Sequence, residues 1–115
     1  MCPLAPAFPP DVAAALQRPD GCVSVRYTRP ADRSWPPPEH DTMLMSTPYE
    51  EVLAALVLDT KGSLRFVRTG SRAEGARVAR TDVRPLVASG ARHWHIVMRW
   101  DAETLFVTAR DQHAR

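Results

Sequence analysis

The chain has 115 residues, of which 44% are hydrophobic and 24% are charged. This composition is too hydrophobic for a disordered chain, the length fits one small domain, and no apolar run approaches the roughly 20 residues that span a bilayer. The formal net charge of +2 conceals an uneven distribution. Residues 60–100 hold nine basic and two acidic residues, a net charge of +7, whereas residues 1–59 carry a net charge of −4. The basic excess therefore lies in the central part of the chain.

Cysteine usage and the N-terminal sequence predict the compartment. Cys2 and Cys22 are too few for a disulfide framework, and their spacing matches no zinc finger, so we expect free thiols. Residues 1–6 (MCPLAP) have neither the basic start nor the apolar core of a secretory signal. We therefore expect a cytoplasmic protein with no cofactor and no bound metal.

The first 20 residues predict an arm with one short helix. Residues 1–10 contain four prolines, which fix φ and remove backbone donors, so this segment is expected to be extended and loosely held. Residues 11–17 predict a helix that Asp11 caps, with Val12 and Leu16 on one face. The turn at residues 19–21 (PDG) would end it.

The period then changes to two. Val23, Val25 and Tyr27 alternate with polar residues, which predicts a half-buried strand over residues 22–28. Residues 31–41 include three consecutive prolines and read as a stiff polyproline-type loop. Residues 42–46 predict a short strand, with Met43 and Met45 on one side as core residues.

Residues 49–58 carry two opposing signals. The sequence TPYE at residues 47–50 has the form of a capping box with proline at the first helical position, which favours a helix. The apolar run at residues 52–58 precedes the glycine turn DTKG and the strand-like residues 64–68, which favours a hairpin. We predict a strand here, with the helix as the alternative.

The C-terminal half continues the strand pattern. Residues 76–81 and 83–87 predict weak strands, the second interrupted by Pro85 and therefore suited to a sheet edge. The clearest element is residues 93–100, in which Trp94, Ile96, Met98 and Trp100 alternate with polar residues and Val97. A hairpin-length turn at residues 101–103 leads to a last strand, in which Leu105, Val107 and Ala109 share one face.

These elements predict an all-β protein. Seven or eight short strands, frequent turns and at most two helices are typical of an antiparallel β-sandwich. We expect an N-terminal arm over residues 1–20, a sandwich domain over residues 21–110 and a tail over residues 111–115.

Three segments follow a familiar order. Residues 21–30 (GCVSVRYTRP) place a glycine before a strand that ends at a proline, and residues 59–66 (DTKGSLRF) surround a glycine turn. Residues 90–101 (GARHWHIVMRWD) and 104–107 (TLFV) form a late hairpin in which a tryptophan and a histidine open the strand. In these respects the chain resembles laminin G-like, concanavalin A-like jelly rolls.

The resemblance implies a short or truncated jelly roll. The family consists chiefly of carbohydrate- or protein-binding modules with some enzymes. Its members usually run longer, and Gln112 stands where a glycine commonly follows Asp111. No acidic pair matches the calcium site of the family, so that site is not carried over.

Strand alternation predicts one cationic sheet face. If the face of Trp94 is core, the residues between its members point outward. If the strands share one sheet, these outward residues form a single ligand-binding face: Arg26, Arg65, His93, His95 and Arg99. Guanidinium and imidazole groups suit carboxylate, phosphate or sulfate ligands. An ordinary solvated sheet face is the alternative.

Metal binding and catalysis are weaker readings of the same residues. His93 and His95 can ligate one metal from a strand, with His40 or Asp101 as a third ligand. Met43 and Met45 are thioether candidates for copper(I), although core packing explains them too. Cys22 or Ser24 with His95 and Asp101 would form a nucleophilic arrangement, but no motif supports one.

We therefore predict a non-catalytic module that binds a carbohydrate, an anionic ligand or a protein partner on its Arg/His face. One alternative is an assembly protein that completes its sandwich by homo-oligomerisation, because an open sheet edge invites pairing. A small enzyme that uses His93 and His95 is another. Nucleic acid is a weaker partner candidate, since the acidic N-terminal half opposes a uniformly basic surface.

Overall fold

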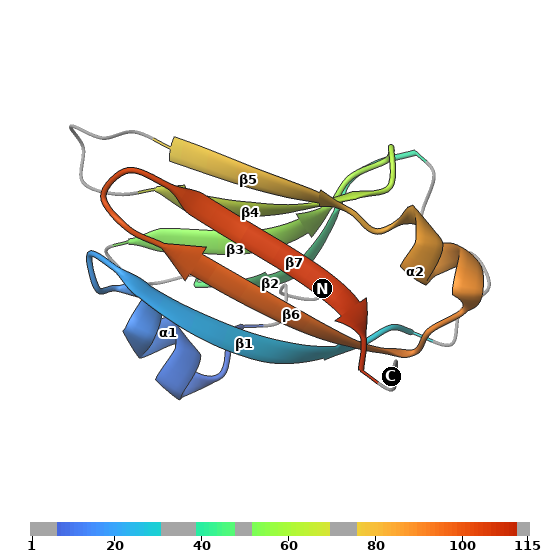
Figure 1. Ribbon diagram of the computed structural model, residues 1–115, viewed down its shortest axis with the longest axis horizontal. Helices are drawn as coiled ribbons and strands as arrows, with labels where there is room; N and C mark the ends of the chain where they lie inside the picture. The colour runs from blue at the N-terminus through green and yellow to red at the C-terminus, as the bar shows by residue number, and fades with distance from the viewer. Residues whose placement is uncertain (1–6, 31–38, 48–51, 70–75, 113–115) are drawn as a thin grey trace, which may run out of the picture.

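The protein is an antiparallel β-sandwich of two sheets (Figure 1). The computed structural model describes residues 7–30, 39–47, 52–69 and 76–112. The three-stranded sheet has the order β1-β6-β7, and the four-stranded sheet is the meander β2-β3-β4-β5. The elements in chain order are α1 (Pro10–Leu16), β1 (Gly21–Thr28), β2 (Thr42–Ser46), β3 (Leu53–Leu58), β4 (Ser63–Thr69), β5 (Ala76–Asp82), α2 (Arg84–Ser89), β6 (His93–Trp100) and β7 (Leu105–Asp111). The predicted all-β sandwich is confirmed.

The core lies between the sheets, where the period-two pattern places the apolar side chains. Trp94, Ile96 and Met98 of β6 are fully buried, as are Leu64 and Phe66 of β4. The Phe66 ring meets the Trp100 ring edge-on, with centroids 6.3 Å apart. Gly21 opposes Trp100 across the sheet, and a Cβ at that position would lie 2.8 Å from the indole, so the close approach of β1 requires glycine.

Helix α1 belongs to this core. Its buried Val12 and Leu16 confirm the predicted apolar face, and Phe8 before it is also buried. The buried guanidinium of Arg68 donates to the carbonyls of Leu16 and Arg18, which fastens the C-terminal end of the helix to β4. The proline content predicts that residues 7 and 8 are loosely held, and this prediction is wrong. The backbone amide of Phe8 donates to the carbonyl of Ser46 in β2. Residues 1–6 lie outside the described part.

Two local predictions are wrong, and both concern residues at which the structure begins a helix. Helix α1 has Pro9 at its N-cap position and no side-chain cap, so Asp11 lies within the first turn and does not cap it. Residues 84–89 form α2 in place of the predicted edge strand. Val83, Leu86 and Val87 have helical spacing and pack on the core, and proline is favourable in a first turn, which explains the outcome.

The prediction for residues 42–46 is correct in type but wrong about which residues face the core. Leu44 is buried, whereas Met43 is exposed on the outer face of the sheet. A register irregularity between Met43 and Met45 lets Met45 pack against the core, so the two methionines do not share one side.

The predicted strand at residues 49–58 is confirmed for Leu53–Leu58, and its first residues lie outside the described part. The loop predicted at residues 31–41 falls mostly there as well. Among the described residues, no helix is long and apolar enough to cross a membrane.

Candidate ligand-binding face

The outer surface of the three-stranded sheet carries most of the predicted site. In Figure 1 this sheet lies in front of the four-stranded sheet, with β6 between β1 and β7. Burial alternates along β6, so that Trp94, Ile96, Met98 and Trp100 face inward. The residues between them, and their partners on β1 and β7, face outward. We call five of these outward residues the cationic face: Arg26, His93, His95, Arg99 and Arg110.

One cross-strand row forms the centre of this face. The antiparallel register aligns Arg26 of β1 with His95 of β6, and His95 with Arg110 of β7. Both arginines are exposed, and His95 is half-buried between them. The Nδ1 atom of His95 is buried and has no hydrogen-bond partner among the described residues. Because adjacent strands are about 4.8 Å apart, the two guanidinium-bearing positions are separated by roughly 10 Å.

The neighbouring rows position two more members of the face. Arg99 aligns with Phe106, and its guanidinium lies 5.0 Å from the centre of the phenyl ring. His93 aligns with Thr28, and the hydroxyl oxygen lies 3.0 Å from the His93 Nδ1 atom. Such stacking and hydrogen bonding limit the rotamers of Arg99 and His93. The face therefore has two side chains held in place, Arg99 and His93, beside the two exposed arginines Arg26 and Arg110.

The electrostatic character of the face follows from what stands at the outward positions. On β1, β6 and β7, no described outward residue is acidic, whereas three are arginines. Asp101, at the β6–β7 turn, accepts from the backbone amides of Glu103 and Thr104 at 2.7 and 2.8 Å. These bonds hold the pKa of Asp101 below its ordinary value. No ion pair within the described residues neutralises Arg26 or Arg110, so their charge is available to a ligand.

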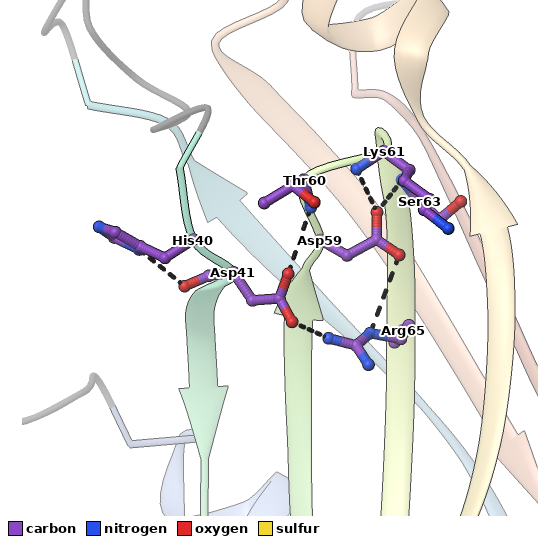
Figure 2. A network of polar contacts seen from close by, with 7 residues as sticks. All are labelled: His40, Asp41, Asp59, Thr60, Lys61, Ser63 and Arg65. Carbon is purple, nitrogen blue, oxygen red and sulfur yellow. Dashed lines mark hydrogen bonds and ion pairs between the residues drawn. The ribbon is translucent and has the colours of Figure 1, made fainter.

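Arg65 does not join this face. It lies on β4 in the other sheet, where its guanidinium donates to Asp41 and lies 3.9 Å from Asp59 (Figure 2). The grouping of Arg65 with Arg26 assumed one sheet, and the topology separates them. Two carboxylates neutralise Arg65, which makes it a structural cation.

The surroundings of Arg65 form a second polar site of mixed charge. A hollow of about 220 Å³ is lined by Asp41, Asp59, Thr60, Lys61, Arg65 and Arg80. Burial of the Asp59 carboxylate would raise its pKa, but amides of Ser63 and Lys61 and the nearby guanidinium of Arg65 outweigh burial and lower it. Figure 2 shows Asp59 bridging the amides of its own turn and Arg65. The Asp59 side chain thus orders the β3–β4 turn.

The metal and nucleophile arrangements are not assembled. His40 precedes β2 in the other sheet, and its Nδ1 atom lies 3.1 Å from the carbonyl oxygen of Asp41. Asp101 lies six residues beyond His95, which is roughly 20 Å along a strand. In the described parts of the chain, no three His, Cys, Asp or Glu side chains are grouped so that they could hold a metal ion. Cys22 is exposed and pairs with Arg99, two outward rows away from the row of Arg26 and His95.

Sequence reasoning missed Arg110. The sequence pattern predicts a last strand in which Leu105, Val107 and Ala109 share the inward face, and this pattern stops one residue before the next outward position. The strand continues to Asp111, and two-residue alternation from Phe106 leads directly to Arg110. Extending the same period by one step would have found it.

The chain matches no family model, no curated protein and no solved structure.

Proposed function

We propose that the protein is a non-catalytic binding module that recognises an extended anionic ligand on the cationic face. One observation carries this proposal. Three adjacent strands present Arg26, Arg99 and Arg110 with two histidines, and no described outward residue of those strands is acidic. A charge of one sign over a sheet surface attracts ligands of the opposite sign.

The chemistry of the side chains defines the ligand class. A guanidinium group forms paired hydrogen bonds with carboxylate, sulfate or phosphate, and charge-assisted bonds of this kind are stronger than neutral ones. Arg26 and Arg110 flank His95 across the strands. A ligand with several anionic groups along its length can contact both arginines at once.

Three sources share this ligand chemistry: an acidic polysaccharide, an acidic segment of a protein and the phosphate backbone of a single-stranded nucleic acid. The stacked Arg99–Phe106 pair suits the ring of a sugar or of a base. The resemblance to laminin G-like jelly rolls favours a carbohydrate or protein ligand. That resemblance and the cytoplasmic location both stay predictions.

The test compares charge reversal on the two sheets. Arg26→Glu combined with Arg110→Glu replaces the outer members of the central row. Arg80→Glu is the control, because Arg80 is an exposed arginine on β5 of the other sheet. Binding would be measured with three probes: a heparin-derived oligosaccharide, polyglutamate and a single-stranded oligonucleotide. We expect the double variant to bind its preferred probe at least tenfold more weakly, while Arg80→Glu binds like the wild type.

Three results would contradict the proposal. The first is wild-type affinity of the double variant for every probe that the wild type binds, and the second is an equal loss in the Arg80→Glu control. The third is failure of the wild type to bind any of the three probes. The identity of the preferred probe distinguishes the three sources of anionic groups.

A further inference from the structure

The outer surface of the four-stranded sheet differs from the cationic face. Outward side chains of β2, β3, β4 and β5 form a contiguous apolar area. Its members are Met43, Leu53, Ala55, Val57, Val67 and Val78, of which Met43, Leu53 and Val78 are 46%, 48% and 48% exposed. A shallow hollow of about 330 Å³ opens here between Met43, Leu53 and Val67. Isolated exposed apolar residues need no explanation, but a contiguous group marks a contact surface.

Charged residues of both signs border this apolar area. The register places Val57 beside Arg65 and Arg65 beside Arg80, and the hollow with Asp41 and Asp59 lies at the same end. We call the six apolar residues, with Asp41, Asp59, Lys61, Arg65 and Arg80, the mixed face. Three cations and two carboxylates nearly balance one another on it. The cationic face has no such balance.

This contrast in charge indicates which partner the mixed face binds. We propose that the mixed face is the interface of a symmetric dimer, in which a second copy of the chain packs its own mixed face against it. A twofold interface uses one surface twice, so it needs a surface that is complementary to itself. Apolar strands with charges of both signs at one end satisfy that condition. The cationic face would repel its own copy, since its charges are of one sign.

Sheet geometry also favours this partner. Two sheets pack face to face about 10 Å apart when their facing side chains interdigitate, and the twist sets strand directions about 30° apart. The hollow gives side chains such as Leu53 of a second copy space to enter. Four strands of about six residues give a flat footprint of roughly 400 Å² per copy. Stable interfaces bury about 800 Å² per partner, so we expect a weak and reversible association.

Dimerisation through this face has a consequence for ligand binding. The cationic face lies on the opposite side of each sandwich. A dimer joined through the mixed faces therefore presents two cationic faces outward, on its two sides. A long anionic chain or a surface with repeated anionic groups would meet a bivalent protein, which raises the overall affinity without any new contact.

The test is sedimentation over a concentration series with two matched lysine variants. Leu53→Lys introduces a charge into the mixed face, and Phe106→Lys introduces the same charge at a residue that is 44% exposed on the other sheet. We expect a concentration-dependent dimer in the wild type and in Phe106→Lys. In Leu53→Lys the dissociation constant should rise at least tenfold. Circular dichroism would check that both variants fold, and Val78→Lys on β5 replaces Leu53→Lys if that variant does not.

Three outcomes would overturn the proposal: a wild-type monomer at every concentration, an unchanged dimer in the folded mixed-face variant, or equal weakening by Phe106→Lys. Loss of probe binding in Arg26→Glu/Arg110→Glu with the dimer intact would support the proposed function and would leave the dimer proposal to the sedimentation result. Probe binding by the double variant and by Arg80→Glu is compared with short probes, at protein concentrations at which the wild type is monomeric in the sedimentation series. Loss of bivalency then does not enter the comparison, and the two proposals are tested independently.

Discussion

The two outer surfaces of this sandwich show how one core can support two chemically different faces. On the three-stranded sheet, the outward positions hold Arg26, Arg99 and Arg110 with no described acidic residue among them. On the four-stranded sheet, Arg65, the outward arginine of β4, is neutralised by Asp41 and Asp59. The difference separates a cation that is used inside the protein from cations that are available to a ligand. Counting basic residues along the sequence does not make this distinction.

The largest expected effect comes from the core that both faces share. Trp94 is fully buried beneath the cationic face and packs edge-on against Tyr27, with ring centroids 5.8 Å apart. Trp94→Ala should lower the free energy of unfolding by about 3–5 kcal/mol, because it removes a large buried side chain and leaves a cavity. Chemical denaturation would measure the loss. Thr108→Ala, at an exposed position on β7, should change the same quantity by less than about 0.5 kcal/mol.

A smaller effect concerns the attachment of α1. Arg68 is buried and donates to the carbonyls of Leu16 and Arg18, and its guanidinium lies 5.8 Å from the Trp100 ring. Arg68→Met keeps the approximate length of the side chain but leaves two carbonyls without this donor. We expect a loss of about 1–3 kcal/mol in the free energy of unfolding and faster hydrogen exchange in α1 than in β6. Uniform exchange in both elements would show that α1 is not separately fastened.

Salt dependence distinguishes the two faces in binding. If three arginines of the cationic face neutralise phosphates of a single strand, the logarithm of the binding constant should fall with the logarithm of the salt concentration with a slope of about −2. Arg110→Ala should reduce the magnitude of that slope by roughly 0.7. Arg80→Ala, on the other sheet, should leave the slope unchanged. An unchanged slope in Arg110→Ala would remove this arginine from the contact.

The smallest expected effect is the acid stability of the β3–β4 turn. The Asp59 pKa is lowered by amides of its own turn and by Arg65, despite burial of the carboxylate. A lowered folded-state pKa contributes stability above the unfolded value near 4, and this stability is lost as the pH falls through the folded value. Asp59→Asn should therefore reduce the melting temperature at neutral pH by a few degrees and flatten its decline below pH 4. Melting curves as a function of pH would show a parallel decline in both proteins if Asp59 made no such contribution.

The local parts of this structure were predictable from the sequence, whereas the assignment of strands to sheets was not. Two-residue alternation identified the inward face of Trp94 and the outward positions of Arg26 and His95, because the direction of a side chain along a strand is a local property. Arg65 was assigned correctly to the outward side of its strand. Its sheet depends on the meander from β2 to β5, which is set by contacts distant in sequence.

The errors at residues 42–46 and 83–87 have related causes. The irregularity between Met43 and Met45 breaks the period that the prediction assumed. The residues from Val83 to Val87 fit both a short edge strand and one helical turn, and their packing on the core decides between them. The mixed face was missed because its apolar outward residues on β3, such as Ala55 and Val57, lie in the continuous apolar run of residues 52–58 and look like core.

The most direct test of ligand binding on the cationic face is a nuclear magnetic resonance titration of the wild-type protein with the anionic probe that binds best. We expect the largest chemical-shift changes at Arg26, His95 and Arg110 and at their outward neighbours on β1, β6 and β7. Shift changes centred on Arg65 and Arg80 of the four-stranded sheet would contradict this expectation.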